Sequence, residues 1–239
     1  MRIQSATPMH NGGWFHRDAS AARSLPPLPP PKPSINATQL MWDILDSDFS
    51  DSVSRLARSL GVSEESLHGI YCGWSKAHHA FAFPMRDEYG NIIGIRLRNE
   101  AGKKWAVTGS RSGLFYPMEW GNSSTAIIVE GPTDVAAALT IGLFAIGRPA
   151  CLGCEDILAR LLKRIGIRQA IIVSDSDSPG LRGANKLDQI LNVAHCMMVL
   201  PFKDMREFVN NGGTQTVFST LLSGMIWHNP QVPDYNALE

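Results

Sequence analysis

The sequence predicts an α/β protein: a parallel β-sheet sandwiched by helices and preceded by a small basic α+β subdomain. Three observations support this prediction. From about residue 122, short apolar runs alternate with helical segments, a pattern typical of parallel strands buried on both faces. Residues 80–109 alternate apolar and polar side chains around two turns, as an antiparallel meander of three strands does. Residues 38–74 carry apolar side chains at helical spacing.

We expect four regions along the chain. They are a disordered Pro-rich tail at 1–38, a helical and β-hairpin basic subdomain at 39–120, the α/β domain at 121–227, and a second tail at 228–239. The run SLPPLPPPKPS at 24–34 favours an extended polyproline conformation. A flexible spacer is the simplest interpretation, and a ligand for a proline-recognising partner is the alternative.

The helical region begins with the segments TQLMWDILDSDF and DSVSRLARSLGV, and Gly61 is expected to end the second. Ser63 is placed to cap a further short helix. In the α/β domain the predicted strands are TAIIVEG, LFAIG, QAIIVSDSD and HCMMVLP. The helices between them are PTDVAAALTIG, CEDILARLLKRIG and SPGLRGANKLDQILN.

Composition limits the functional classes. Lys plus Arg and Asp plus Glu both number 22, so the net charge is zero and any attraction for nucleic acid must come from a local cluster. Four cysteines in 239 residues do not form a disulfide framework, and Cys151 and Cys154 lack a second pair for zinc. With no secretory signal and no long apolar run, we expect a cytoplasmic protein without membrane contact.

Acidic residues follow three of the predicted strands. Glu130 ends TAIIVE, Asp175 and Asp177 end QAIIVSD, and Asp204 follows the last strand, while Asp134 lies one turn into a helix. A single acid at such a position is usually a helix cap. Several carboxylates at one sheet edge repel unless a cation neutralises them, and oxygen ligands without His or Cys favour Mg²⁺ or Mn²⁺.

Four cations gather on the second predicted hairpin. Arg96, Arg98, Lys103 and Lys104 are interrupted only by Glu100, and Trp105 follows them. Such charges are commonly a solvated face. Here they also predict a phosphate- or nucleic-acid-binding surface, with Trp105 beside it.

The stretches IIVEGPTDVAAAL, AIIVSDSDSPGLRGANKL and LPFKDMREFV resemble a Toprim domain, shared by bacterial-type primases, topoisomerases and some nucleases. The likeness is greatest to the primase part of phage primase-helicases and their mitochondrial relative, and RDEYGNIIGIRLRNEAGKKWAVTGSRSGLF resembles the basic subdomain that precedes Toprim there. It covers roughly residues 60–230.

This resemblance implies a role for each acid. Glu130 would be the general base or a metal ligand, Asp134 would support catalysis, and the metal ligands would be Asp175, Asp177 and Asp204. The hairpin cations would contact nucleotide phosphates or the template. Implied partners are single-stranded DNA and nucleoside triphosphates.

Two familiar parts of those primases have no counterpart in the sequence. Nothing upstream of Cys72 supplies a four-cysteine zinc ribbon, and no GxxxxGK[ST] phosphate loop indicates a helicase motor. We therefore expect a separate helicase or zinc-ribbon protein as partner. The resemblance to phage primases implies a phage or mobile-element origin. The expected function is metal-dependent synthesis of short primers. The alternatives are a Toprim nuclease and a non-catalytic replisome or nucleic-acid-binding module.

Overall fold

The computed structural model describes residues 8–9, 13–14, 34–47, 51–150, 153–175 and 178–229. Residues 1–32 form a unit of their own, in which strands β1 (Pro8–Met9) and β2 (Gly13–Trp14) pair antiparallel. Most of the Pro-rich run, the last ten residues, Cys151 and Asp177 lie outside the described residues. The division into four regions therefore stays a prediction.

A four-stranded parallel sheet forms the centre of the second unit. Its strands are β7 (Thr125–Glu130), β8 (Ala145–Arg148), β9 (Gln169–Ser174) and β10 (Ala194–Val199), in the spatial order β10-β9-β7-β8. All the neighbouring pairs are parallel. The continuous apolar runs of the sequence are buried on both faces, as the α/β prediction required.

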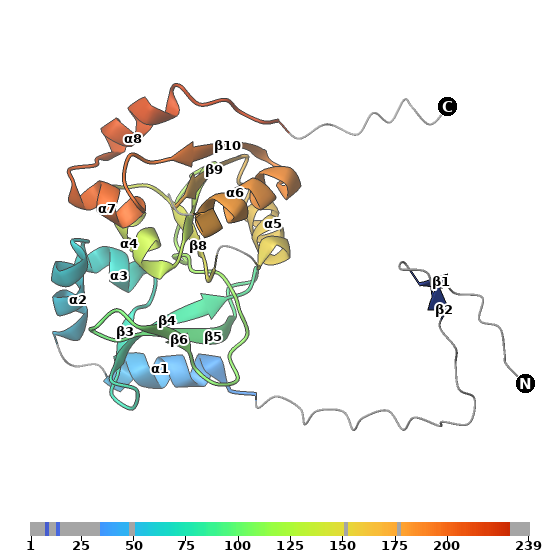
Figure 1. Ribbon diagram of the computed structural model, residues 1–239. Helices are drawn as coiled ribbons and strands as arrows, with labels where there is room; N and C mark the ends of the chain where they lie inside the picture. The colour runs from blue at the N-terminus through green and yellow to red at the C-terminus, as the bar shows by residue number, and fades with distance from the viewer. Residues whose placement is uncertain are drawn as a thin grey trace, which may run out of the picture. The chain divides into compact units, whose positions relative to one another are not determined.

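Helices cover both faces of this sheet (Figure 1). One face packs against α4 (Pro132–Thr140), α7 (Met205–Asn210) and α8 (Gln215–Leu222). The other face packs against α5 (Glu155–Arg164) and α6 (Ser178–Ile190). The predicted α/β fold, with its parallel sheet between helices, is confirmed, while α7 and α8 are additions that the strand pattern did not predict.

The upstream region contains a four-stranded antiparallel sheet. Its strands run in the order β3 (Gly73–Ser75), β4 (Ala80–Arg86), β5 (Ile92–Arg98) and β6 (Lys104–Ala106). The predicted meander corresponds to β4, β5 and β6. Sequence reasoning missed β3, because a three-residue strand is too short to show an alternating pattern.

Three helices accompany this sheet. The helix α1 (Ala37–Ser47) packs on its outer face, and α2 (Ser52–Leu60) and α3 (Glu64–Gly69) join the main core. Gly61 ends α2 in the left-handed conformation with φ of 67°, which glycine adopts without a Cβ penalty. The Ser63 hydroxyl accepts a hydrogen bond from the Ser66 N–H, so it caps α3 as predicted.

A short extended segment joins the two sheets. Leu114 exchanges two backbone hydrogen bonds of 2.8 Å with Arg86 of β4. The next residue, Phe115, exchanges hydrogen bonds of 2.9 and 2.7 Å with Gly147 of β8. The antiparallel sheet is thus attached to the edge of the parallel sheet through backbone groups. No helix among the described residues is long and apolar enough to cross a bilayer.

Candidate active site

The candidate site lies at the carboxyl ends of the parallel strands. From β7 the chain passes to β8 on one side, and β9 then pairs with the other side of β7. In open α/β sheets, ligands bind beside the strand ends where the chain direction diverges in this way. Glu130 ends β7 and Asp175 directly follows β9, so these two predicted residues flank that point.

One cavity of about 380 Å³ collects most of the predicted site residues. Its volume is within the range of pockets that hold small molecules. The described acids and three of the four hairpin cations contribute to its lining: Glu130, Asp134, Asp175, Asp204, Arg96, Arg98 and Lys104. The structure therefore brings the acidic end of the parallel sheet and the basic hairpin to a single site.

Asp134 is the most buried of these acids, with 6% of its surface exposed. Its Oδ1 accepts a hydrogen bond of 3.1 Å from the Arg206 backbone N–H. Burial, together with the charges of Asp204 and Asp175, raises its carboxyl pKa to about 8. A neutral or metal-neutralised state of this group is favoured for the same reasons.

Asp204 has a structural task as well as a place in the cavity. Its Oδ1 accepts a 2.7 Å hydrogen bond from the Glu207 N–H, which makes it the N-cap of α7. Glu207 accepts a 2.7 Å hydrogen bond from the N–H of Lys203, the residue before the cap, and so also holds the start of this helix. The general expectation that an acid at a strand end caps a helix thus holds for Asp204, while its Oδ2 lies 3.7 Å from an Arg206 guanidinium nitrogen.

The strand register explains which cations reach the cavity. Arg98 lies opposite Phe81 on one side and Lys104 on the other, and directly opposed residues share a face of the sheet. Lys103 precedes β6, is exposed and does not line the cavity. The expectation that Trp105 lies beside the basic face is wrong, because Trp105 alternates to the other face and packs in the α1 cluster.

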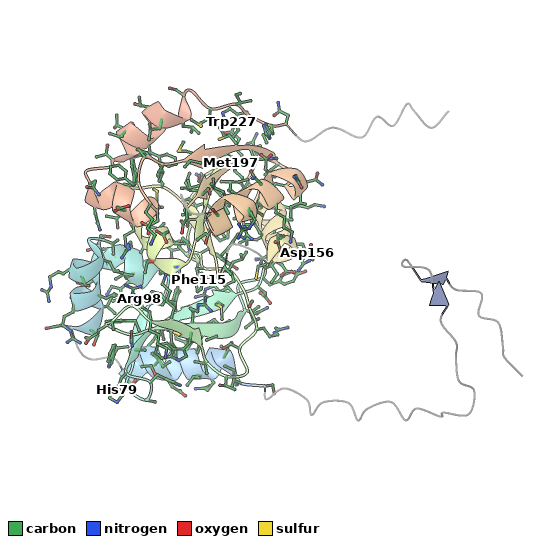
Figure 2. All side chains as sticks on the ribbon, viewed as in Figure 1. His79, Arg98, Phe115, Asp156, Met197 and Trp227 are labelled. Carbon is green, nitrogen blue, oxygen red and sulfur yellow. The ribbon has the colours of Figure 1, made fainter. Side chains whose placement is uncertain are left out.

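Sequence reasoning missed several residues of this cavity, including the cations Arg148, Lys203 and Arg206. Arg148, the last residue of β8, is buried with 3% exposure, and Arg206 lies two residues after Asp204. Phe115 also contributes, and Figure 2 shows it with Arg98 between the two sheets. A basic residue at a strand's carboxyl end was the available signal for Arg148, whereas nothing local distinguishes Arg206 or Phe115.

The cations of the cavity also influence one another. Burial lowers the pKa of the Arg98 guanidinium, the positive charge of Arg206 lowers it further, and Asp134 acts in the opposite direction. The Nε of Arg206 is buried and makes no hydrogen bond to the described residues. An anionic ligand would relieve the repulsion and supply the missing acceptor.

The donor set around the cavity fits a hard divalent cation, since its acids offer carboxylate oxygens. Among the described residues, no three of these carboxylates lie close enough together to form one multidentate cage. Mg²⁺ typically takes one or two carboxylates and completes its shell with water and phosphate oxygens. Such a loosely convergent set suits that mode of binding.

Comparison of this fold with solved structures identifies similar proteins. The Escherichia coli primase catalytic core matches with a TM-score of 0.61 and 17% identity, over 80% of this chain and 79% of that chain. The Aquifex aeolicus primase, with zinc-binding and RNA polymerase domains, matches with a TM-score of 0.65 and 17% identity, over 79% and 60% of the two chains. The primase fragment of the bacteriophage T7 primase-helicase gives 0.58 and 20%, over 69% and 72%.

The fold is that of bacterial-type primase catalytic cores. A DnaG primase catalytic domain bound to single-stranded DNA also matches, with a TM-score of 0.60 and 16% identity over 80% of each chain. No protein-family model matches the sequence, and no curated protein does. The Toprim resemblance is thus confirmed at the level of the primase-type fold. Because cellular and phage primases both match, the finer likeness to phage primases stays a prediction.

Proposed function

We propose that this protein is a primase-type nucleotidyltransferase that synthesises short primers on single-stranded DNA, using Mg²⁺ or Mn²⁺. One observation carries the proposal: the acidic strand ends and the basic face of β5 and β6 line the same cavity. Carboxylates suit metal ions and the cations suit phosphates, so a nucleoside triphosphate with its metal complements both groups.

The cavity residues divide by charge into two tasks. Glu130, Asp175 and Asp204 would hold metal, with the neighbouring Asp177 as a further ligand although it lies outside the described residues. A bound Mg²⁺ would offset negative charge that develops on the phosphate oxygens. The cations would bind the triphosphate or template, and they are Arg96, Arg98 and Lys104, joined by Arg148, Lys203 and Arg206.

In the proposed reaction, the 3′-hydroxyl oxygen of one nucleotide forms a bond to the α-phosphorus of the next. The bond between that phosphorus and the bridging oxygen to the β-phosphate breaks, and pyrophosphate leaves. Glu130 is the candidate to accept the hydroxyl proton, since it ends β7 at the edge of the cavity. Asp134 supports the site from its buried position in α4.

A hydrogen bond to the backbone holds Arg96 where it could bind phosphate. Its Nη2 donates a 3.0 Å hydrogen bond to the Pro149 carbonyl, in the loop that follows β8. This bond connects the basic sheet to the loop at the carboxyl end of the parallel sheet. The guanidinium is therefore held at the junction where phosphate would lie between the two sheets.

A primer-synthesis assay tests the proposal. The purified protein is incubated with single-stranded DNA, labelled nucleoside triphosphates and Mg²⁺ or Mn²⁺, and the products are separated by gel. We expect short labelled oligomers with the wild type and none with Glu130→Gln or Asp175→Asn. Asp156→Asn is the matched control, because Asp156 is exposed on α5 and does not line the cavity (Figure 2).

The same gel separates the alternative functions. Shortened DNA without oligomers would identify a nuclease, and the basic hairpin would then lack a role. DNA binding without either product would identify a non-catalytic module. If no oligomers form alone, a second assay adds a separate helicase or zinc-ribbon protein as a partner for template selection.

A further inference from the structure

A second cluster of metal-ligand side chains lies at the other end of the parallel sheet. Asp188 comes from α6, His195 from the start of β10, and His228 from the segment after α8. Each offers one ligand atom, and these atoms all lie within 4.8 Å of one another. Since β10 spans six residues, this cluster lies roughly 15 Å from the strand ends that carry the acidic cavity.

Backbone pairing fixes the two histidines beside each other. His195 N–H donates to the His228 carbonyl at 2.9 Å, and His228 N–H donates to the His195 carbonyl at 2.7 Å. The segment that carries His228 therefore adds an isolated antiparallel bridge to β10, the edge strand of the sheet. Figure 2 shows Trp227, the preceding residue, where this segment passes β10.

Both ring nitrogens of His195 face oxygen atoms. Its Nδ1 lies 2.7 Å from the Val193 carbonyl oxygen, a contact that fixes the proton on Nδ1 in a neutral imidazole. Its Nε2 then presents a lone pair to the Asp188 main-chain oxygen at 2.9 Å and to Asp188 Oδ1 at 3.4 Å. In a neutral imidazole these lone pairs would repel one another, and either a second ring proton or a metal ion relieves that repulsion.

Asp188 Oδ1 lies beside the rings of both histidines. This oxygen is buried and has no aligned hydrogen-bond donor among the described residues, although His228 Nδ1 lies only 2.8 Å away. Neighbouring ligand atoms of a tetrahedral zinc ion lie about 3.3 Å apart, given bonds of about 2.0–2.1 Å. The contacts of 2.8 and 3.4 Å to this oxygen bracket that separation.

We propose that Asp188, His195 and His228 form a zinc site that fastens the segment after α8 to the edge of the parallel sheet. Two imidazoles and one carboxylate favour Zn²⁺ over Mg²⁺. The hydrogen bond from His195 to a backbone carbonyl is the support that metal-bound histidines usually have. The His228 side chain is 51% exposed, so water can reach the remaining coordination position.

Zinc binding to the full-length protein tests this site independently of the proposed function. The protein is stripped with a chelator, and Zn²⁺ is titrated in against a chromogenic competitor, with excess Mg²⁺ present to occupy the acidic cavity. We expect one equivalent of zinc to bind to the wild type. Loss of a residue that only hydrogen-bonds to a metal ligand typically weakens metal affinity by roughly 10–100-fold. Because His228 is itself a proposed ligand, we expect His228→Ala to weaken zinc affinity by more than that.

A matched control and a second variant guard against misfolding. His68→Ala removes another histidine that contacts a carboxylate, Glu64 at 3.3 Å, and it should bind zinc like the wild type. Asp188→Asn keeps the side-chain shape and should lose affinity as His228→Ala does. Zinc at about a hundredfold excess over its Kd should raise Tm by roughly 5–10 °C in the wild type only.

Cobalt substitution identifies the ligands. We expect the d–d absorption of a four-coordinate Co²⁺ complex without the charge-transfer bands of thiolates. Thiolate bands would assign the metal to cysteines such as Cys154 and overturn the proposal. Equal zinc affinity of the wild type and His228→Ala, or no measurable zinc binding by the wild type, would overturn it as well, leaving a cluster neutralised by protons.

Discussion

Replacing Asp134 with asparagine should stabilise the metal-free protein at neutral and alkaline pH. In the folded state burial and the neighbouring carboxylates of Asp204 and Asp175 raise the pKa of Asp134 to about 8, from an ordinary value of 3.8. Asparagine keeps the side-chain shape and an Oδ1 that can accept the Arg206 N–H, but it carries no charge. The variant therefore removes the electrostatic cost and keeps the contact.

The direction of this stability change follows from the protonation of Asp134 in the folded and the unfolded chain. At a pH below 3.8 the Asp134 carboxyl is protonated in both the folded and the unfolded chain, so its burial as a charge does not lower the free energy of unfolding. As the pH rises, the unfolded chain ionises first, and unfolding is increasingly favoured until the folded group also ionises near pH 8. Above that pH the cost is constant.

The magnitude follows from the same shift. Each unit of pKa difference corresponds to about 1.36 kcal/mol. Between pH 5 and pH 8, the advantage of Asp134→Asn over the wild type in unfolding free energy should grow by roughly 2–4 kcal/mol, after discounting for relaxation of the site. For a chain of this size, that corresponds to a difference in Tm of roughly 5–15 °C.

The assay is urea or thermal denaturation followed by circular dichroism, in a chelator, at several pH values between 5 and 9. Saturating Mg²⁺ should narrow the difference, because a cation at the cavity stabilises the ionised wild-type carboxylate. A difference between wild type and variant that stays constant across this pH range would refute the reasoning. Such a result would mean that Asp134 is solvated as an ordinary carboxylate.

Two further predictions concern the hairpin and the turn beside the cavity. Lys104→Ala should raise the KM for nucleotide or weaken DNA binding by about tenfold, the effect of about 1.4 kcal/mol, whereas Lys103→Ala should change little, because only Lys104 lines the cavity. Steady-state kinetics of primer synthesis compares them, and equal effects would contradict the register argument. Gly147→Ala should destabilise the protein by roughly 1–3 kcal/mol, since its Cβ would lie 2.6 Å from the Gly131 carbonyl oxygen. Urea denaturation measures this, with Gly69→Ala as the control, because a Cβ there meets nothing within 4 Å; equal stabilities would contradict the close packing.

The sequence predicted the α/β domain well because its signals are local. Each parallel strand is a continuous apolar run, and turn residues such as Gly61 and Gly142 mark helix ends. Since parallel strands end at one edge of a sheet, the order of the elements alone placed Glu130 and Asp175 near each other. No distance between strands was needed for that inference.

The rest of the site depends on contacts between distant segments, which no local pattern encodes. The register of β5 and β6 decides that Lys104 lines the cavity and Lys103 does not. The backbone of Phe115 attaches the basic sheet to β8, although Phe115 lies outside every strand that the sequence predicted. The pairing of His195 with His228 joins residues 33 positions apart and was equally invisible.

The attachment through Leu114 and Phe115 also bears on how Arg98 and Asp134 face each other across the cavity. Arg98 and Asp134 influence each other electrostatically, yet no salt bridge joins them in the described part of the chain. If the two sheets could approach freely, such opposite charges would pair and neutralise the site. Because backbone hydrogen bonds attach the two sheets to each other, Arg98 and Asp134 stay unpaired, and phosphate on one side and a metal ion on the other could offset their charges.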